Sequence, residues 1–301
     1  MRIIVHIGHY KTGTTALQQR FSDNRSFLAE HGIVYPELAT LVDAAGLVLP
    51  SHSPFVFAMF EQRGFNNPAW YRDVLAADDD PPTLASMQQT LRAVVDQAVV
   101  DDHDVVLSSE EFMRFGAGGR HDGLVGEFGD LLGDVSVEIF CHLRRPDLYL
   151  RSWYNQMIKL GALRPNMSEH MPNYFHQVHV DYPMALRPWV EQFGRDHVTV
   201  RRYEDRVGDV SDDLLRAFGH DLELPEDSAV WVNERFPDVH IETLRLWNWV
   251  RAPGHLSERL RQTMIAHAER EGLRDLGVEF MTPAAKQLLH DKCVEVVAEL
   301  D

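Results

Sequence analysis

Residues 6–15 of the chain, HIGHYKTGTT, place a lysine among two glycines and three threonines directly after an apolar run. Glycine permits backbone angles that other residues resist, so Gly8 and Gly13 can shape a tight loop. We expect a helix to follow, with the two threonines after Gly13 capping it and donating hydroxyls. Backbone N–H groups at a helix N-terminus, together with the helix dipole, attract anions. The segment therefore predicts an anion-binding loop, and a plain strand–turn–helix connection with a solvated Lys11 is the alternative.

The position of the lysine separates this loop from that of nucleotide kinases. The glycines have the spacing of the triphosphate loop G-x-x-x-x-G-K-[ST], but Thr14 stands where that pattern has its lysine. A kinase needs its lysine on the outer phosphates and a hydroxyl on Mg²⁺. Lys11, which comes earlier, can instead neutralise the charge that develops on the oxygen bridging a phosphate and a departing sulfuryl group. The position of the lysine thus counts against a Walker-type kinase or nucleotidase, which is kept as an alternative.

A pair of arginines follows another apolar run. Residues 137–143 lead into Arg144 and Arg145, and Pro146 suits the first turn of a helix because its missing N–H costs nothing there. Arginine offers a planar fork of donors that fits phosphate oxygens. Ser152, eight residues after Arg144, can add a hydroxyl from the same side. A second anion site is one interpretation, and a surface arginine pair beside an exposed serine is the other.

These motifs resemble those of the sulfotransferases that use 3′-phosphoadenosine 5′-phosphosulfate (PAPS). KTGTT at residues 11–15 is similar to the family's 5′-phosphosulfate loop, and the longer form IGHYKTGTTALQQ is closest to bacterial members. Arg144 and Ser152 match the family's 3′-phosphate signature, an arginine at a strand end and a serine eight residues on. Residues 203–205, Tyr-Glu-Asp, resemble the element that places a tyrosine near adenine. The resemblance extends from residue 3 to about residue 218.

The resemblance implies a sulfotransferase that moves a sulfuryl group from PAPS to a hydroxyl or amino group of an unidentified small-molecule or carbohydrate acceptor. The donor leaves as adenosine 3′,5′-bisphosphate, Lys11 stabilises this leaving group, and no metal is needed. The donor-binding residues that the resemblance implies are Lys11, Thr12, Gly13, Thr14, Thr15, Arg144, Ser152 and Tyr203. The C-terminal part matches only loosely, through residues 233–235, and lacks the Gly-rich 3′-phosphate loop of cytosolic eukaryotic members.

Transfer to a hydroxyl needs a general base near the attacking oxygen, and family members use a histidine or a glutamate. Ligands of open α/β sheets bind beyond the carboxyl ends of strands, which favours Glu110, after residues 104–107, and His9. Glu111 is adjacent to Glu110, and His52 lies in an irregular aromatic segment. Glu110 is the first choice for the catalytic base and His52 the second, with a structural role as the alternative for each.

The elements that must position these residues alternate between strand and helix. Apolar runs predict strands at 2–7, 104–107, 136–143 and 197–203, and helical periodicity predicts helices at 84–100, 184–193, 214–218, 241–250, 256–270 and 283–300. Continuous apolar runs are typical of parallel strands covered on both faces. We therefore expect an α/β fold, a P-loop-like doubly wound parallel sheet flanked by helices, with a helical C-terminal region.

We expect one domain over residues 1–301. Residues 40–82 break the strand–helix rhythm with five prolines, six aromatic residues and an acidic run, and are predicted to be an insertion that helps to wall the acceptor site. Residues 226–301 carry no strand pattern and are predicted to form a helical flank.

Composition and charge argue against several partners. The chain has 29 Lys and Arg against 46 Asp and Glu, a net charge of −17, so its surface repels nucleic acid and anionic lipid. No signal peptide and no run of ~18 apolar residues is evident, so we expect a cytoplasmic protein that does not insert into a membrane. Its two cysteines are too few and too distant for a disulfide framework or a metal site, and Cys141 is expected to be a buried hydrophobe.

A third hypothesis is a nucleotide-binding module without catalysis, whose acidic surface recruits a protein partner. Lys11 and the pair Arg144 and Ser152 count against it, because a module that lost its chemistry has no need to retain them. The sequence names neither the acceptor nor the oligomeric state.

Overall fold

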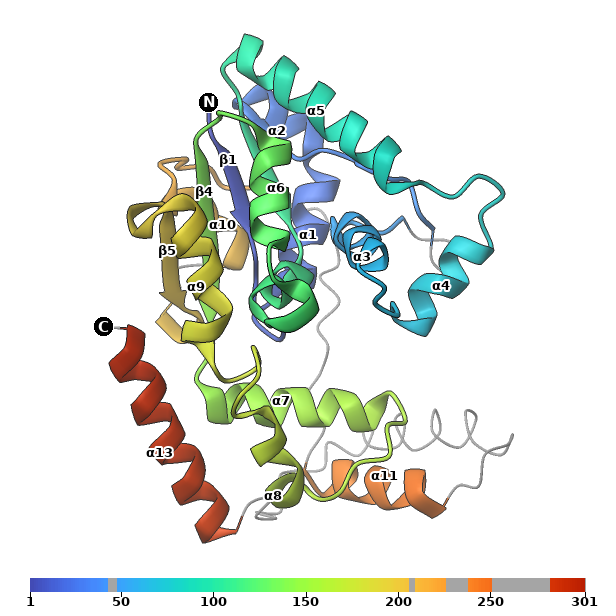
Figure 1. Cartoon of the computed structure of the whole chain (residues 1–301), viewed down its shortest axis with the longest axis vertical. Coiled ribbons are helices and arrows are strands. Elements are labelled where there is room, and N and C mark those ends of the chain that lie inside the picture. Colours follow the sequence, from blue (N-terminus) through green and yellow to red (C-terminus); the bar gives the residue numbers. More distant parts are fainter. Residues whose placement is uncertain (43–47, 206–208, 226–237, 251–281, 301) are drawn as a thin grey trace. The chain divides into compact units, whose positions relative to one another are not determined.

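The computed structural model describes residues 1–300 apart from 43–47, 206–208, 226–237 and 251–281 (Figure 1). The chain divides into two compact units. Unit 1 comprises Met1–Arg144 and Pro183–Trp231, and unit 2 comprises Arg145–Tyr182 and Val232–Asp301. The helical flank predicted for residues 226–301 therefore falls mostly within unit 2, and the helix predicted at 256–270 lies outside the described residues.

Unit 1 is built on a sheet of five parallel strands in the order β2-β3-β1-β4-β5. The strands are β1 (Ile3–His6), β2 (Ile33–Val34), β3 (Asp104–Ser108), β4 (Val137–Leu143) and β5 (Val198–Arg202). The four predicted strands are confirmed to within one residue at each end. The sequence did not predict β2, because two residues are too few to show a periodic pattern. Every residue of β1 and β3 is buried, as expected for strands covered on both faces.

The central strand is β1. Its register joins Ile3 to Val105 of β3 on one side and to Val137 of β4 on the other. After β1 the chain adds β2 and β3 on one side and then crosses over to add β4 and β5 on the other, so the order reverses at β1. Open α/β sheets bind ligands beyond the carboxyl ends of their strands at such a reversal. Residues 8–13, which follow β1 directly, occupy this position.

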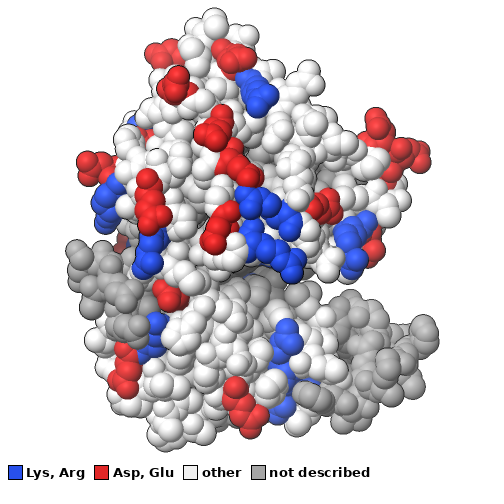
Figure 2. Space-filling view, in the orientation of Figure 1, with Lys and Arg blue, Asp and Glu red and all other residues white. Residues whose placement is uncertain are grey.

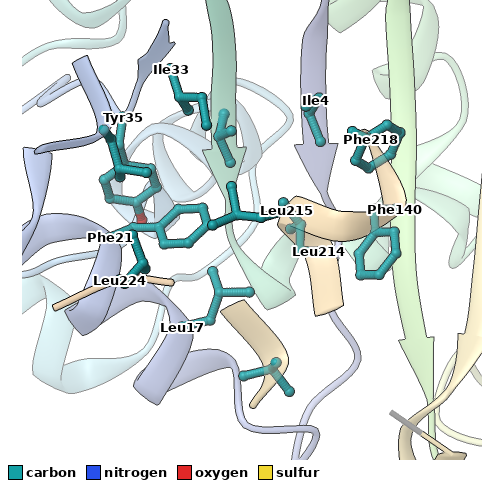
Figure 3. Close-up of a cluster of buried hydrophobic side chains, with 13 residues drawn as sticks. Ile4, Leu17, Phe21, Ile33, Tyr35, Phe140, Leu214, Leu215, Phe218 and Leu224 are labelled. Carbon is teal, nitrogen blue, oxygen red and sulfur yellow. The ribbon is translucent and has the colours of Figure 1, made fainter. Parts of the chain in front are cut away.

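One face of the sheet is covered by α1 (Thr14–Asp23), α2 (Arg25–Glu30) and α10 (Val210–Ala217). Figure 3 shows the cluster that joins them to the strands, with Ile4, Leu17, Phe21, Ile33, Tyr35, Phe140, Leu214, Leu215, Phe218 and Leu224 labelled. Leu17 and Phe21 lie one turn apart and are fully buried. Burying each such side chain contributes about 1.5–3 kcal/mol. This stripe anchors α1 to the sheet and so fixes its N-terminus at the end of the loop after β1.

The other face is covered by α5 (Leu84–Asp101), α6 (Leu124–Leu132), α9 (Tyr182–Phe193) and the 3₁₀ segment η1 (Glu110–Gly116). In Figure 1, α6 and α9 lie in front of the sheet. Four buried rings pack against one another here, from Phe112, Phe115, Phe128 and Trp189. A Cβ at Gly116 would lie 2.3 Å from the Ala185 carbonyl oxygen, so η1 and α9 touch backbone to backbone. This packing holds η1, the segment that begins with Glu110, in a fixed place.

The segment predicted as an acceptor-site insertion contains α3 (Ser53–Gln62) and α4 (Ala69–Ala76). Phe55, Phe57 and Phe60 of α3 are at most 1% exposed. They are core residues of unit 1, and the part of residues 40–82 in walling an acceptor site stays a prediction. Trp70 is 48% exposed and packs edge-on against Phe57.

Unit 2, where it is described, is helical. Its helices are α7 (Pro146–Lys159), α8 (Met167–His170), α11 (Asp238–Val250) and α13 (Pro283–Leu300). Both α11 and α13 pack against α7. The helices predicted at 241–250 and 283–300 are confirmed. Among the described helices, none has the length and apolar character needed to cross a membrane.

Candidate functional site

The loop after β1 contains three residues with left-handed backbone angles, Gly8 (φ 63°), Lys11 (φ 65°) and Gly13 (φ 78°). For a lysine this conformation costs of order 1–3 kcal/mol and persists only where the surroundings impose it. The Thr12 hydroxyl donates to the His9 carbonyl (2.5 Å) and closes the loop from within. Loops of this kind direct backbone N–H groups into a concave anion site. The Thr12 hydroxyl is thus occupied by the loop itself, and a bound anion would meet backbone N–H groups.

Helix α1 begins without a capping side chain in the described structure. Its N-cap is Gly13, and the first intrahelical bond runs from the Leu17 N–H to the Gly13 carbonyl (3.1 Å). The N–H groups of residues 14–16 therefore have no partner within the helix. The prediction that Thr14 and Thr15 cap the helix is wrong, because they are its first two helical residues; Thr14 is buried and Thr15 exposed. The uncapped N–H groups and the helix dipole favour an anion at this end.

Gly8 lies where a side chain has no room. A Cβ there would lie 3.0 Å from Thr14 Cγ2 and 3.1 Å from the Cα of Glu110. The Gly8 carbonyl accepts a hydrogen bond from the Cys141 thiol on β4 (2.7 Å). Burial raises the pKa of this thiol well above its usual value, so it remains protonated and can donate. The predicted burial of Cys141 is confirmed, and its thiol also holds the loop against the sheet.

A second link joins the loop to η1. Tyr10 hydrogen-bonds to the Glu111 carboxylate, which also accepts a hydrogen bond from Arg114 Nη1 (3.0 Å). Burial raises the pKa of Tyr10 and then the negative charge of Glu111 raises it further, so the phenol keeps its proton and donates it. Burial also raises the pKa of Glu111, against the opposing effect of Arg114. These contacts occupy the Glu111 carboxylate with structural partners.

Glu110 stands beside the loop, as the first residue of η1 and half-buried. Its Oε2 accepts a hydrogen bond from Gln18 Nε2 on α1 (3.0 Å). The backbone of Glu110 lies against Gly8, at the adjoining carboxyl ends of β3 and β1. The residue chosen from the sequence as the catalytic base is therefore next to the loop that follows β1.

The two candidate histidines occupy different surroundings. Both ring nitrogens of His52 are engaged by the backbone: Nδ1 accepts the Ser108 N–H (2.9 Å) and Nε2 donates to the Pro36 carbonyl (2.9 Å). Burial lowers the pKa of His52 to about 4. His52 thus joins the segments before α3 to the end of β3, and this geometry gives it a structural role instead of that of a base. His9 is fully buried within the loop, with Nδ1 3.2 Å from the Tyr10 carbonyl oxygen.

The loop, the end of β4 and the end of β5 meet at Arg144. Its Nη1 donates to the Lys11 carbonyl (3.1 Å), and its guanidinium lies over the Tyr203 ring, 5.4 Å from the centroid. Tyr203 begins the 3₁₀ turn η5 (Tyr203–Asp205) directly after β5, and its Cε2 is 3.7 Å from the Cβ position of Gly13. Arg144 Nε is also 3.7 Å from the Glu204 carboxylate. The structure therefore brings together Lys11, Gly13, Arg144 and Tyr203.

Ser152 lies on α7 and is half-buried. It belongs to unit 2, whereas Arg144 is the last residue of the first segment of unit 1. Within α7, Pro146 occupies the first turn as predicted. The 3′-phosphate role of Ser152 stays a prediction, and residues 233–235 lie outside the described part of the chain.

The positive charge at this site comes from a few neighbouring groups in a chain that is negatively charged as a whole. Figure 2 shows Lys and Arg interspersed with Asp and Glu over the face in view, and the chain as a whole has a net charge of −17. An anionic ligand would therefore be attracted by the loop N–H groups, Lys11 and Arg144, and not by the field of the whole molecule.

Sequence reasoning did not identify three residues that support the site, Gln18, Ser108 and His6. All three are at most 3% exposed and form hydrogen bonds beside Glu110. One signal was present: His6 is a polar residue inside an otherwise apolar run, and buried polar groups need partners.

Comparison with known proteins assigns no function to the residues of this site. No protein-family model matches the chain. The chain is similar to an uncharacterized protein of Archaeoglobus fulgidus, with 27% identity over 143 residues. This alignment covers 46% of the present chain and 36% of the archaeal protein.

Proposed function

We propose that this protein is a PAPS-dependent sulfotransferase with a P-loop-like, doubly wound sheet. The observation that carries the proposal is the contact between Arg144 and the carbonyl of Lys11. It joins the two motifs that the sequence assigns to opposite ends of one nucleotide, 133 residues apart in the chain. The ring of Tyr203 lies against the Arg144 guanidinium and close to Gly13. In this proposal it contacts the adenine, which lies between the two phosphate-bearing ends of the nucleotide.

In the proposed reaction the acceptor oxygen or nitrogen attacks the sulfur of PAPS in line with the bridging oxygen. The new bond to sulfur forms as the bond between sulfur and the bridging oxygen breaks, and adenosine 3′,5′-bisphosphate leaves. Lys11 and the N–H groups of residues 14–16 stabilise the charge that grows on the phosphate side. The proton of the acceptor passes to Glu110. The acceptor would be a small molecule or a carbohydrate.

A nucleotide kinase is the second candidate, because its loop has the same glycine spacing. The residue at its lysine position is Thr14, which is buried against Gly8. Lys11 instead lies inside the loop, at a backbone conformation that lysine rarely adopts. These two features favour sulfuryl transfer over phosphoryl transfer.

A thermal-shift panel separates the candidates, including a nucleotide-binding module without catalysis. Adenosine 3′,5′-bisphosphate should stabilise the protein without Mg²⁺, by about 2.7 kcal/mol at 100 times its dissociation constant. ATP should have little effect with or without Mg²⁺. Stabilisation by ATP and Mg²⁺ alone would refute the proposal in favour of a kinase. Binding of the bisphosphate without sulfuryl transfer to any acceptor class in a screen with labelled PAPS would favour the non-catalytic module.

A further inference from the structure

The side chain of Gln18 lies between the candidate base and the core of the sheet. Its Nε2 is 3.0 Å from Glu110 Oε2 and 3.4 Å from Ser108 Oγ, so one amide nitrogen serves both acceptors. Gln18 is 3% exposed. A buried amide is costly unless its hydrogens are bonded, so these two contacts hold the side chain in one orientation.

The Ser108 hydroxyl is in turn hydrogen-bonded to a histidine on the neighbouring strand β1. Its Oγ is 2.8 Å from His6 Nδ1. Burial, together with the neighbouring His142, lowers the pKa of His6 to about 3, so the ring is neutral near pH 7. His6 Nε2 is buried without a partner in the described structure. The tautomer with the proton on Nδ1 avoids an unpaired N–H, and in it His6 donates to Ser108.

We infer that Gln18 is a positioning residue for Glu110, and this inference rests on the proposed function. The amide fixes Oε2 of the carboxylate through a chain of contacts that runs from β1 through β3 to α1. With Oε2 held, rotation of the carboxylate is restricted and Oε1 is the oxygen that takes the acceptor proton. General base catalysis depends on this geometry first.

Gln18 also links the base to the donor site. It lies one turn after Thr14, on the helix whose N-terminus ends the anion-binding loop. The same helix therefore positions both the base, through Gln18, and the donor, through its N-terminus. The reaction rate depends strongly on this alignment, because a displacement of about 1 Å between reacting groups can lower the rate by the order of 10²-fold.

The test compares Gln18→Leu with Gln19→Leu. Gln19 is the next residue of α1, is exposed, and bonds to Asp23 (2.8 Å), so it controls for the loss of a glutamine from this helix. The assay is release of adenosine 3′,5′-bisphosphate from PAPS with 2-naphthol, chitobiose or water as acceptor. Gln18→Leu should lower kcat on the order of 10–100-fold and leave the KM for PAPS within about 3-fold. Gln19→Leu should change neither.

A double-mutant cycle distinguishes positioning from a general structural role. If Gln18 acts through the carboxylate, Gln18→Leu should lower kcat no further in a Glu110→Gln background. An equal loss in both backgrounds, or an unchanged kcat in the single variant, would overturn the role of Gln18 while leaving the proposed function intact. Gln18→Met serves in the same cycle if the leucine variant fails to fold. A wild-type protein that releases no bisphosphate from PAPS would refute the proposed function and with it this inference.

Discussion

Replacing Arg144 with alanine tests the donor site through two separable effects. The first is on the protein itself, because Arg144 donates to the Lys11 carbonyl and lies over Tyr203. This hydrogen bond has a charged donor and contributes about 1.5–3 kcal/mol, or about 12–150-fold in affinity for any ligand of the loop. The second effect is on the 3′-phosphate, to which an arginine would contribute about 1.5–3 kcal/mol, or about 12–150-fold.

The difference between two nucleotides isolates the second effect. Adenosine 5′-phosphosulfate lacks the 3′-phosphate, so its affinity should fall only by the loop contribution. Adenosine 3′,5′-bisphosphate should lose both, and the ratio of the two losses should be about 12–150. Isothermal titration calorimetry of both nucleotides measures this ratio. Arg144→Lys is the matched control, because it keeps the charge and loses the planar fork, and it should fall between wild type and Arg144→Ala.

Equal weakening of the two nucleotides would refute the assignment. Arg144 would then act only on the loop, through its contacts with Lys11 and Tyr203. A change in the bisphosphate alone, with the phosphosulfate unaffected, would show that the loop does not depend on Arg144.

Three further predictions concern catalysis and stability. Lys11→Ala should lower kcat by about 10²–10³ while the Kd of adenosine 3′,5′-bisphosphate changes little, because the charge on the bridging oxygen grows only in the transition state; near wild-type turnover at saturating PAPS would contradict this. Glu110→Gln should lower kcat by about 10²–10⁴ and abolish the acid limb of the pH–rate profile, whereas His52→Asn should keep that limb, and the reverse pattern would make His52 the base. His52 should also tie stability to pH: its folded pKa of about 4 lies below the unfolded value of 6.5, so the unfolded chain takes up the proton first and the free energy of unfolding falls as pH drops from 6.5 toward 4. Urea unfolding at pH 7 and pH 5 should show this slope, and His52→Asn should reduce it without abolishing it, because His6, with a folded pKa of about 3, acts in the same direction.

The strands and the loop could be predicted because each is encoded by a short pattern of neighbouring residues in the sequence. β1, β3 and β4 are mostly apolar runs, and such runs have few explanations other than a sheet covered on both faces. The two glycines and Lys11 stand close together in sequence, so their spacing alone indicated a loop. The residues that support Glu110 come from three distant elements, and no local pattern relates Gln18 to Ser108 or His6.

Two features of the site region have a physical cause that the sequence did not make plain. A helix that is apolar on all sides is a buried helix, so Phe55, Phe57 and Phe60 of α3 lie in the core, and the wider prediction of an acceptor-site insertion at residues 40–82 stays untested. Thr14 and Thr15 were interpreted as caps because threonine commonly caps helices. The helix starts one residue earlier than a cap at Thr14 requires, because Gly13, in the left-handed conformation that ends the loop, is the N-cap.

The register of β1 and β3 sets the spacing between the two sides of the proposed reaction. His6 pairs with Ser108, and both Gly8 and Glu110 come two residues after that pair. The separation between the loop and the base is thus a property of the sheet, inherited from backbone pairing and independent of the length of chain between the strands. A change in the length of a surface loop between β2 and β3 leaves it unchanged, whereas removing one residue from β3 would shift Glu110 by about 3.3 Å and reverse its face. Pairing within the sheet thus sets the place of the proposed base relative to the loop, whatever the length of the surface loops that lead to β3.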